Sequence, residues 1–196
     1  NACRGFNQKD LVKRYHRWWN LGAFDTGRTF AMVFQKVSKG MSVEDASIQV
    51  DKSLNGETAG CGPAHRIAPL AAFKKISTNE LVGYAREEAK ITHRHPDASN
   101  CSGIMVLLCR YLLEGYSWDE SKNLVSKNEE IKSTWVKIQK ANLNNGGYVL
   151  DVMHSAIHFL DRKDALSNSL IFAGSANYCP VIVGILQEII DNNSIT

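Results

Sequence analysis

The sequence predicts an all-α fold, and three observations support that class. Signals for helix starts are frequent, apolar residues recur at the three- and four-residue spacing of a buried helix face, and the alternating runs typical of strands are short. The clearest apolar series is Ile104, Leu107, Leu108, Tyr111 and Leu112, and others run through residues 135–141 and 149–160.

Serine followed three positions later by glutamate marks several of these helix starts. In this capping box the serine oxygen accepts a backbone N–H, and the glutamate reaches back to the cap. Ser42 marks another start, because acids follow it in the first turn, where the helix dipole favours them. The pattern occurs at Ser77-x-x-Glu80, Ser117-x-x-Glu120 and Ser126-x-x-Glu129.

In chain order, a loop at 20–27 separates helices expected at 8–20 and 28–38, and Ser42 caps a third at 43–53. A loop at 54–65 precedes helices at 66–75 and 78–91. The turn at 92–96 leads into 96–114, and the remaining capping boxes accompany helices at 118–126 and 129–140. After a loop at 142–147 we expect helices at 147–160, 162–172 and 179–191, with Asp161 and Asp164 as acids of a first turn.

Length and composition are those of one globular domain spanning 1–196. A chain of 196 residues can bury roughly 70% of its unfolded surface without a metal or disulfide. With 44% hydrophobic and 22% charged residues it is not disordered, and no apolar run is long enough for a membrane span. Five cysteines without C-x-x-C spacing indicate reduced thiols, and we expect a cytoplasmic protein.

A net charge of +3 does not by itself indicate a nucleic-acid partner. The densest basic cluster lies between Lys13 and Arg17, interleaved with Tyr15, Trp18 and Trp19. On a helix these charges and aromatic rings fall on different faces. The cluster therefore predicts an amphipathic helix with a solvated face, and no nucleic acid is expected to bind there.

Four loop segments carry the candidate chemistry. Gly60-Cys61-Gly62 precedes an apolar helix, so it is either an anion-binding helix start or a structural Gly-rich turn. The turn His93-Arg94-His95-Pro96 suits hydrogen bonding to a ligand, acid–base chemistry, metal ligation or simple capping. The other two are Gly147-Tyr148, where Tyr148 either closes over a ligand or packs as a staple, and the stretch from Ala173 to Pro180, where Cys179 is expected to be buried and inert.

Taken in order, these segments resemble the ADP-ribosylglycohydrolase family over nearly all of the chain. Gly60-Cys61-Gly62-Pro63-Ala64-His65-Arg66-Ile67-Ala68-Pro69-Leu70 is similar to the family's G-N-G-x-x-M-R-x-A-P-L, with Cys61 and His65 in place of Asn and Met. Thr92-His93-Arg94-His95-Pro96 resembles its T-H-x-H-P turn, and Gly147-Tyr148-Val149 resembles its G-Y-V helix opening. Tyr15-x-x-Trp18 followed by Gly22-Ala23-Phe24-Asp25-Thr26-Gly27 is similar to the family's helix and F-D-x-G turn.

The resemblance implies a compact orthogonal multi-helix bundle that cleaves ADP-ribose from modified side chains or small molecules with a pair of magnesium ions. It implies that the loop from Gly60 to Arg66 holds the phosphates or the distal ribose, and that Tyr148 lies over the ligand. The ligand-binding residues it predicts are Gly60, Cys61, Gly62, His65, His93, His95, Gly147 and Tyr148.

The metal motifs depart from the family pattern. The family's T-D-D motif lies upstream of where this chain begins, so we expect an upstream segment to be absent. The G-G-D-x-D-T motif aligns with Ala173 to Tyr178, where Ser175 and Asn177 replace both aspartates. Neutral oxygens do not neutralise two divalent ions, so no Mg²⁺ site is predicted.

Three functions follow from this comparison. The first is magnesium-dependent hydrolysis of an ADP-ribosyl bond. The second is an inactive relative that binds ADP-ribose or a nucleotide, and the third is a structural protein similar to the lens crystallins that resemble this family.

Overall fold

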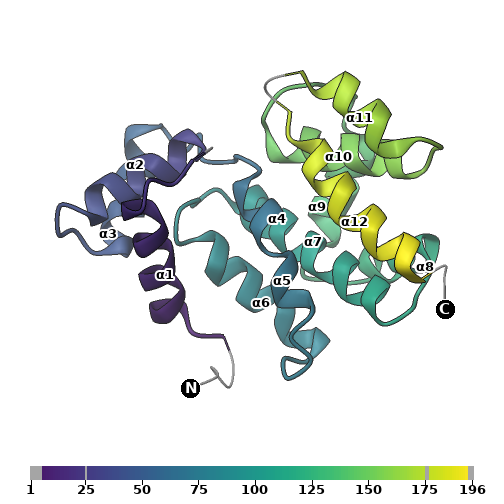
Figure 1. Cartoon of the computed structure of the whole chain (residues 1–196), viewed down its shortest axis with the longest axis horizontal. Helices are drawn as coiled ribbons and strands as arrows, with labels where there is room; N and C mark the ends of the chain where they lie inside the picture. Colours follow the sequence, from purple (N-terminus) through teal and green to yellow (C-terminus); the bar gives the residue numbers. More distant parts are fainter. Residues whose placement is uncertain (1–5, 25, 175–176, 194–196) are drawn as a thin grey trace.

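The computed structural model describes residues 6–24, 26–174 and 177–193, and over these residues the fold is all-α, as predicted (Figure 1). These residues form twelve helices and no strand. The helices are α1 (Gln8–Asn20), α2 (Arg28–Val37), α3 (Val43–Ser53), α4 (Gly62–Arg66), α5 (Ala68–Ala71), α6 (Thr78–Ala89), α7 (Pro96–Leu113), α8 (Trp118–Ser126), α9 (Lys132–Lys140), α10 (Val149–Leu160), α11 (Ala165–Ala173) and α12 (Cys179–Asn193). None of the helices in this part of the chain is both long and apolar enough to cross a membrane.

The serine caps decide where several helices begin, with one exception. Ser42, Ser77 and Ser117 cap α3, α6 and α8 as predicted, the last two with complete capping boxes. The capping box predicted at Ser126 is wrong, because Ser126 is the last residue of α8 and its hydroxyl donates to the Asn123 carbonyl. Val125 is buried in α8, and this packing extends the helix to Ser126. The next helix, α9, begins at Lys132.

The helix predicted at 66–75 is also wrong and is replaced by two short helices. Pro69 has no N–H to donate to the His65 carbonyl, so the run of helical hydrogen bonds is interrupted between α4 and α5. The buried Arg110 holds the segment that follows, donating to the carbonyl oxygens of Ala71, Phe73 and Ile76 at 2.7–3.1 Å.

Asp161 and Asp164 are not acids of a first turn, as expected from the sequence. Asp161 ends α10 and accepts hydrogen bonds from Trp118 Nε1 and Lys122 Nζ at 2.7 and 2.6 Å. Asp164 precedes α11 in a left-handed conformation, with φ of 56°. The turn between α10 and α11 is therefore set by a tertiary contact to α8 as well as by local capping.

The main core surrounds α7, which runs through the middle of the molecule (Figure 1). Fourteen of its 18 residues are buried. At Gly103 a Cβ atom would lie 3.2 Å from Val82 Cγ1 of α6, so glycine allows these two helices to pack closely. Such burial on all sides requires an apolar helix, which explains the dense hydrophobic series in the sequence.

A second, smaller core joins α1, α2 and α3 at the end of the molecule near the N-terminus (Figure 1). Phe30 and Phe34 of α2 stack with ring centroids 4.5 Å apart, and Tyr15 of α1 packs edge-on against both. Ile91, which follows α6, belongs to this core. Tyr15 and Trp19 of α1 are partly buried against this core, which fits the amphipathic helix predicted from the basic cluster, whereas Trp18 is 40% exposed.

Candidate functional site

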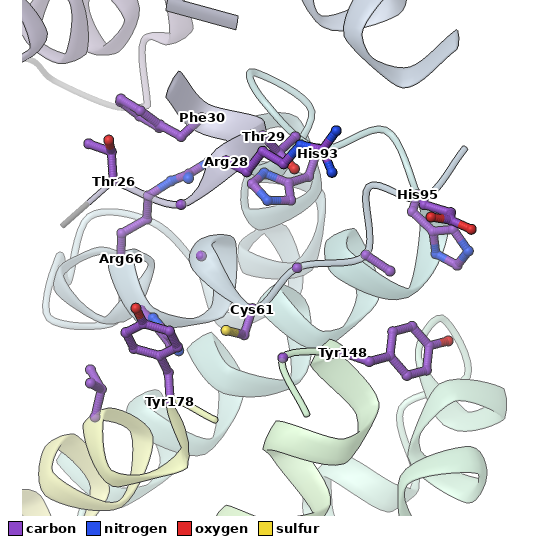
Figure 2. A pocket seen from close by; sticks show the side chains of 18 of the residues that line it. Thr26, Arg28, Thr29, Phe30, Cys61, Arg66, His93, His95, Tyr148 and Tyr178 are labelled. Atoms are coloured by element: carbon purple, nitrogen blue, oxygen red, sulfur yellow. The ribbon is translucent and has the colours of Figure 1, made fainter. Parts of the chain in front are cut away.

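A cavity of about 1180 Å³ lies where the helices of the small core meet the main core (Figure 2). Its walls come from α1, α2, the 55–66 segment, the turn at 93–95, the 147–148 loop and the start of α12. All eight residues predicted to bind a ligand line this one cavity: Gly60, Cys61, Gly62, His65, His93, His95, Gly147 and Tyr148. The structure therefore brings together segments that are up to 88 positions apart in the sequence (148 minus 60).

The glycine loop, Gly60-Cys61-Gly62, forms the floor of the cavity. It packs closely against the neighbouring segments. Gly60 forms an isolated antiparallel bridge with Tyr148, and the Val149 N–H donates to the Ala59 carbonyl at 2.9 Å. A Cβ on Gly60 would lie 3.2 Å from His93 Nε2, tighter than most real contacts. Glycine is needed here for space, and its missing side chain leaves room for a ligand beside the imidazole.

Arg66, at the end of α4, is the centre of a buried polar network behind the floor. Its Nε donates to Glu88 Oε1 at 2.5 Å and its Nη2 donates to Thr92 Oγ1 at 2.8 Å. Tyr15 also donates to Glu88 Oε1, at 2.7 Å. Burial opposes the charge of Arg66, but the Glu88 carboxylate outweighs it and holds the pKa of the guanidinium above its ordinary value. The network ties α1, α4 and α6 together.

Thr92 holds the ring of His93. The Thr92 hydroxyl is fully buried and accepts from Arg66 Nη2, and its oxygen lies within hydrogen-bond distance of His93 Nδ1, at 2.7 Å. The other ring nitrogen, Nε2, has no hydrogen-bond partner among the residues the structure describes. Burial, with help from the charge of Arg66, lowers the pKa of His93 to about 3. The side chain is a neutral imidazole that lines the cavity.

His95 serves chiefly as a cap. Its Nδ1 accepts from the Asp97 N–H at 3.1 Å at the start of α7, and Pro96 occupies the first turn, where a missing N–H is tolerated. The His95 N–H donates to Thr58 Oγ1 at 3.1 Å. The two histidines of this turn therefore differ: His93 has a ring nitrogen available to a ligand, and His95 shapes the rim.

Tyr148 lines the cavity, but its hydroxyl is held at the rim. The hydroxyl donates to Asp97 Oδ2 at 2.6 Å, and Lys137 Nζ donates to Asp97 Oδ1 at 3.0 Å. Burial raises the pKa of Asp97, yet these two hydrogen bonds outweigh it and hold the pKa below its ordinary value. Asp97 is thus an anchoring carboxylate for the Gly147-Tyr148 loop.

The two cysteines near the cavity are poor nucleophiles. Cys61 lines it and Cys179 is fully buried at the start of α12, and both are free thiols. Burial raises the pKa of each to about 11, so the reactive thiolate is scarce at neutral pH. This agrees with the inert Cys179 expected from the sequence.

The donor set does not fit a pair of magnesium ions. Glu57 is the single carboxylate among the described residues that line the cavity, and those residues hold no cluster of three or more potential metal ligands. Asn177 is occupied elsewhere: its Nδ2 donates to the Asn144 and Gly146 carbonyls at 3.0 Å, and its Oδ1 accepts from the Cys179 N–H at 2.7 Å. Ser175 lies outside the described residues.

Several lining residues were not predicted as site residues. Tyr15, Trp18, Tyr178 and the segment around Arg28 all line the cavity. Arg28, Thr29 and Phe30 of α2 line the cavity, as His93 does (Figure 2). The F-D-x-G turn was visible as a landmark before α2, but nothing in its spacing indicates that the start of α2 opens on the glycine loop.

Comparison with known families agrees with this architecture. A family model described as ADP-ribosylglycohydrolase matches residues 1–184, which is nearly the whole chain. No curated protein matches the chain. The helical fold over the described residues and the converging motifs are consistent with that match, and the chain belongs to the ADP-ribosylglycohydrolase family.

Proposed function

We propose that this chain binds ADP-ribose, free or attached to a substrate, in the cavity over Gly60-Cys61-Gly62, and that it does so without magnesium-dependent hydrolysis. The observation that carries the proposal is the convergence of all eight predicted residues on one cavity. Sites for drug-sized ligands are usually about 300–1,000 Å³. A cavity of about 1180 Å³ has room for a ligand with two sugars and a diphosphate.

The charge of the lining supports an anionic ligand. Arg14, Arg28 and Arg66 line the cavity, the first and last of them in ion pairs with Asp10 and Glu88, whereas Glu57 is the single acid among the described lining residues. Cationic walls around a low-dielectric cavity attract anions and disfavour divalent cations. The same charge distribution that suits a diphosphate therefore argues against a magnesium pair.

The floor offers polar groups to the ligand. His93 Nε2 has no hydrogen-bond partner among the described residues, and the open space at Gly60 lies beside it. Near Gly62, Arg66 Nη1 would lie 3.7 Å from an added Cβ, so a donor borders the same space. His93 remains neutral throughout the physiological pH range because burial lowers its pKa to about 3.

Calorimetry with ADP-ribose, in magnesium and in EDTA, tests the proposal. We expect the same affinity in both buffers, and no ADP-ribose released from an ADP-ribosylated peptide incubated with magnesium. Binding that requires magnesium, or release of ADP-ribose, would overturn the metal-independent assignment. Absence of binding in both buffers would overturn ligand binding itself.

Gly62→Val tests the position of the ligand, with Gly62→Ala as the matched control. An added Cβ meets His93 Cε1 at 3.6 Å, an ordinary contact, so alanine is compatible with the fold. The branched valine fills the space over the loop, so we expect it to abolish binding while the far-UV circular dichroism stays unchanged. Full binding by Gly62→Val would show that the ligand lies elsewhere.

A further inference from the structure

Tyr178 and His65 form an aromatic pair in the wall of the cavity. Their ring centroids lie 5.5 Å apart with the planes tilted by 46°, and both residues line the cavity. Tyr178 is 37% exposed, although its neighbours in the chain, Asn177 and Cys179, are buried. An aromatic ring that stays partly exposed in a cavity wall offers a large contact area to a flat group of a ligand.

The backbone on both sides of Tyr178 is fixed by hydrogen bonds that do not involve its ring. Before it, Asn177 Oδ1 accepts from the Cys179 N–H at 2.7 Å, and Asn177 Nδ2 donates to carbonyls of the 144–146 loop at 3.0 Å. After it, the Val181 N–H donates to the Tyr178 carbonyl at 3.1 Å, at the start of α12. The ring therefore stands on a fixed backbone, so a ligand that contacts it costs little ordering of the chain.

A second aromatic pair, His95 and Tyr148, lines the same cavity. Its ring centroids lie 6.5 Å apart, and the ring planes are nearly perpendicular, at 85°. In Figure 2, Tyr178 lies to the left of Cys61 and Tyr148 lies to the right. The cavity therefore carries aromatic side chains on both sides of the glycine loop, over which ADP-ribose is proposed to bind.

We propose that the ligand of this cavity is a dinucleotide, in which a diphosphate joins two nucleosides, and that the Tyr178–His65 pair stacks on its second base. The inference rests on the proposed function for the diphosphate and the first nucleoside, because ADP-ribose itself carries only one base. The cavity volume of about 1180 Å³ exceeds the range usual for drug-sized ligands, so an added base has room. Aromatic side chains stack on the π-face that every base has, so the pair requires a base but tolerates different ones.

Calorimetry in EDTA with ADP-ribose, diadenosine diphosphate and NAD⁺ tests the proposal. The last two ligands differ from ADP-ribose by a base on the second ribose, adenine in one and nicotinamide in the other. We expect the wild type to bind the better of these dinucleotides about tenfold more tightly than ADP-ribose, a factor within the range that stacking of one base on an aromatic side chain contributes. The dinucleotide that binds more tightly identifies the class of the second base.

Three variants test the role of the Tyr178 ring. Tyr178→Leu removes the ring but keeps a bulky apolar side chain, so the affinities for the dinucleotide and for ADP-ribose should become equal within about twofold. Tyr178→Phe keeps the ring and should retain the preference of the wild type. Tyr116→Leu is the matched control and should also retain it, because Tyr116 is 42% exposed and packs edge-on against Tyr111 at 5.9 Å, away from the residues that line the cavity.

The possible outcomes separate this inference from the proposed function. If neither dinucleotide binds the wild type more tightly than ADP-ribose, or if the preference survives in Tyr178→Leu, the second base site is refuted and ADP-ribose binding stands. Dinucleotide binding that depends on the Tyr178 ring, without any ADP-ribose binding, would support the second base site and overturn the proposed function. If none of the three ligands binds the wild type, both proposals fail. Unchanged far-UV circular dichroism of the variants excludes unfolding as the cause.

Discussion

Replacing His93 by glutamine should remove much of the acid sensitivity of folding between pH 7 and pH 5. The imidazole is buried against Thr92, Arg66 and the glycine loop, and burial holds its pKa at about 3. In the unfolded chain the pKa of histidine is about 6.5. The unfolded state therefore takes up a proton in a range in which the folded state does not.

The sign and size follow from this difference in pKa. Stability contributed by neutral His93 is complete above the unfolded pKa and is lost as pH falls toward about 3. One proton per molecule corresponds to at most about 1.4 kcal/mol per pH unit. With an unfolded pKa of about 6.5, the free energy of unfolding should fall by about 2 kcal/mol from pH 7 to pH 5 on account of this residue.

Urea unfolding followed by far-UV circular dichroism at both pH values measures the effect. His93→Gln loses the hydrogen bond between the imidazole and Thr92, so its stability at pH 7 should be about 1 kcal/mol lower. Its further decrease toward pH 5 should be about 2 kcal/mol smaller than that of the wild type. His158→Gln, at a less buried histidine, is the control and should keep most of the wild-type decrease. An equal decrease in wild type and His93→Gln would refute a buried neutral His93.

Two further substitutions test the networks around the cavity. Glu88→Gln leaves the Arg66 guanidinium without its counter-charge, so the free energy of unfolding should fall by about 3–5 kcal/mol. In urea titrations the double variant Glu88→Gln with Arg66→Met should lose less stability than Glu88→Gln alone. A greater loss would contradict the view that an unpaired buried charge causes the effect. Asn177→Asp places a carboxylate against the carbonyls of Asn144 and Gly146, so thermal unfolding should occur at a lower temperature, equivalent to about 2–3 kcal/mol. An unchanged melting temperature at neutral pH would show that the Asn177 amide does not hold this loop.

Local patterns in the sequence predicted most of the helices because the forces that set helix ends act over a few residues. The serine caps at Ser42, Ser77 and Ser117 and the dense apolar series of α7 are examples. The same logic failed at Ser126, where packing of Val125 extended α8 through a capping sequence. It also failed at 66–75, where Pro69 divided the expected helix.

The residues of the site were predicted by motif, but their roles depend on tertiary contacts. The eight predicted residues all line one cavity, and whether they bind a ligand stays a prediction. His93 and His95 look equivalent in sequence, and only their contacts with Thr92 and Asp97 distinguish a buried ring that lines the cavity from a helix cap.

By itself, the sequence determined the helical class, the family resemblance and the absence of aspartate from the motif at 173–178, because each can be read within a short window. Only the tertiary structure decided that Asn177 holds the 144–146 loop, that Thr92 and Arg66 hold the ring of His93 in the cavity wall, and that α2 lines the same cavity as the glycine loop. These contacts form when helices that are distant in the sequence bury their apolar faces against one another and bring polar groups into hydrogen-bonding distance. A short stretch of sequence therefore does not predict them.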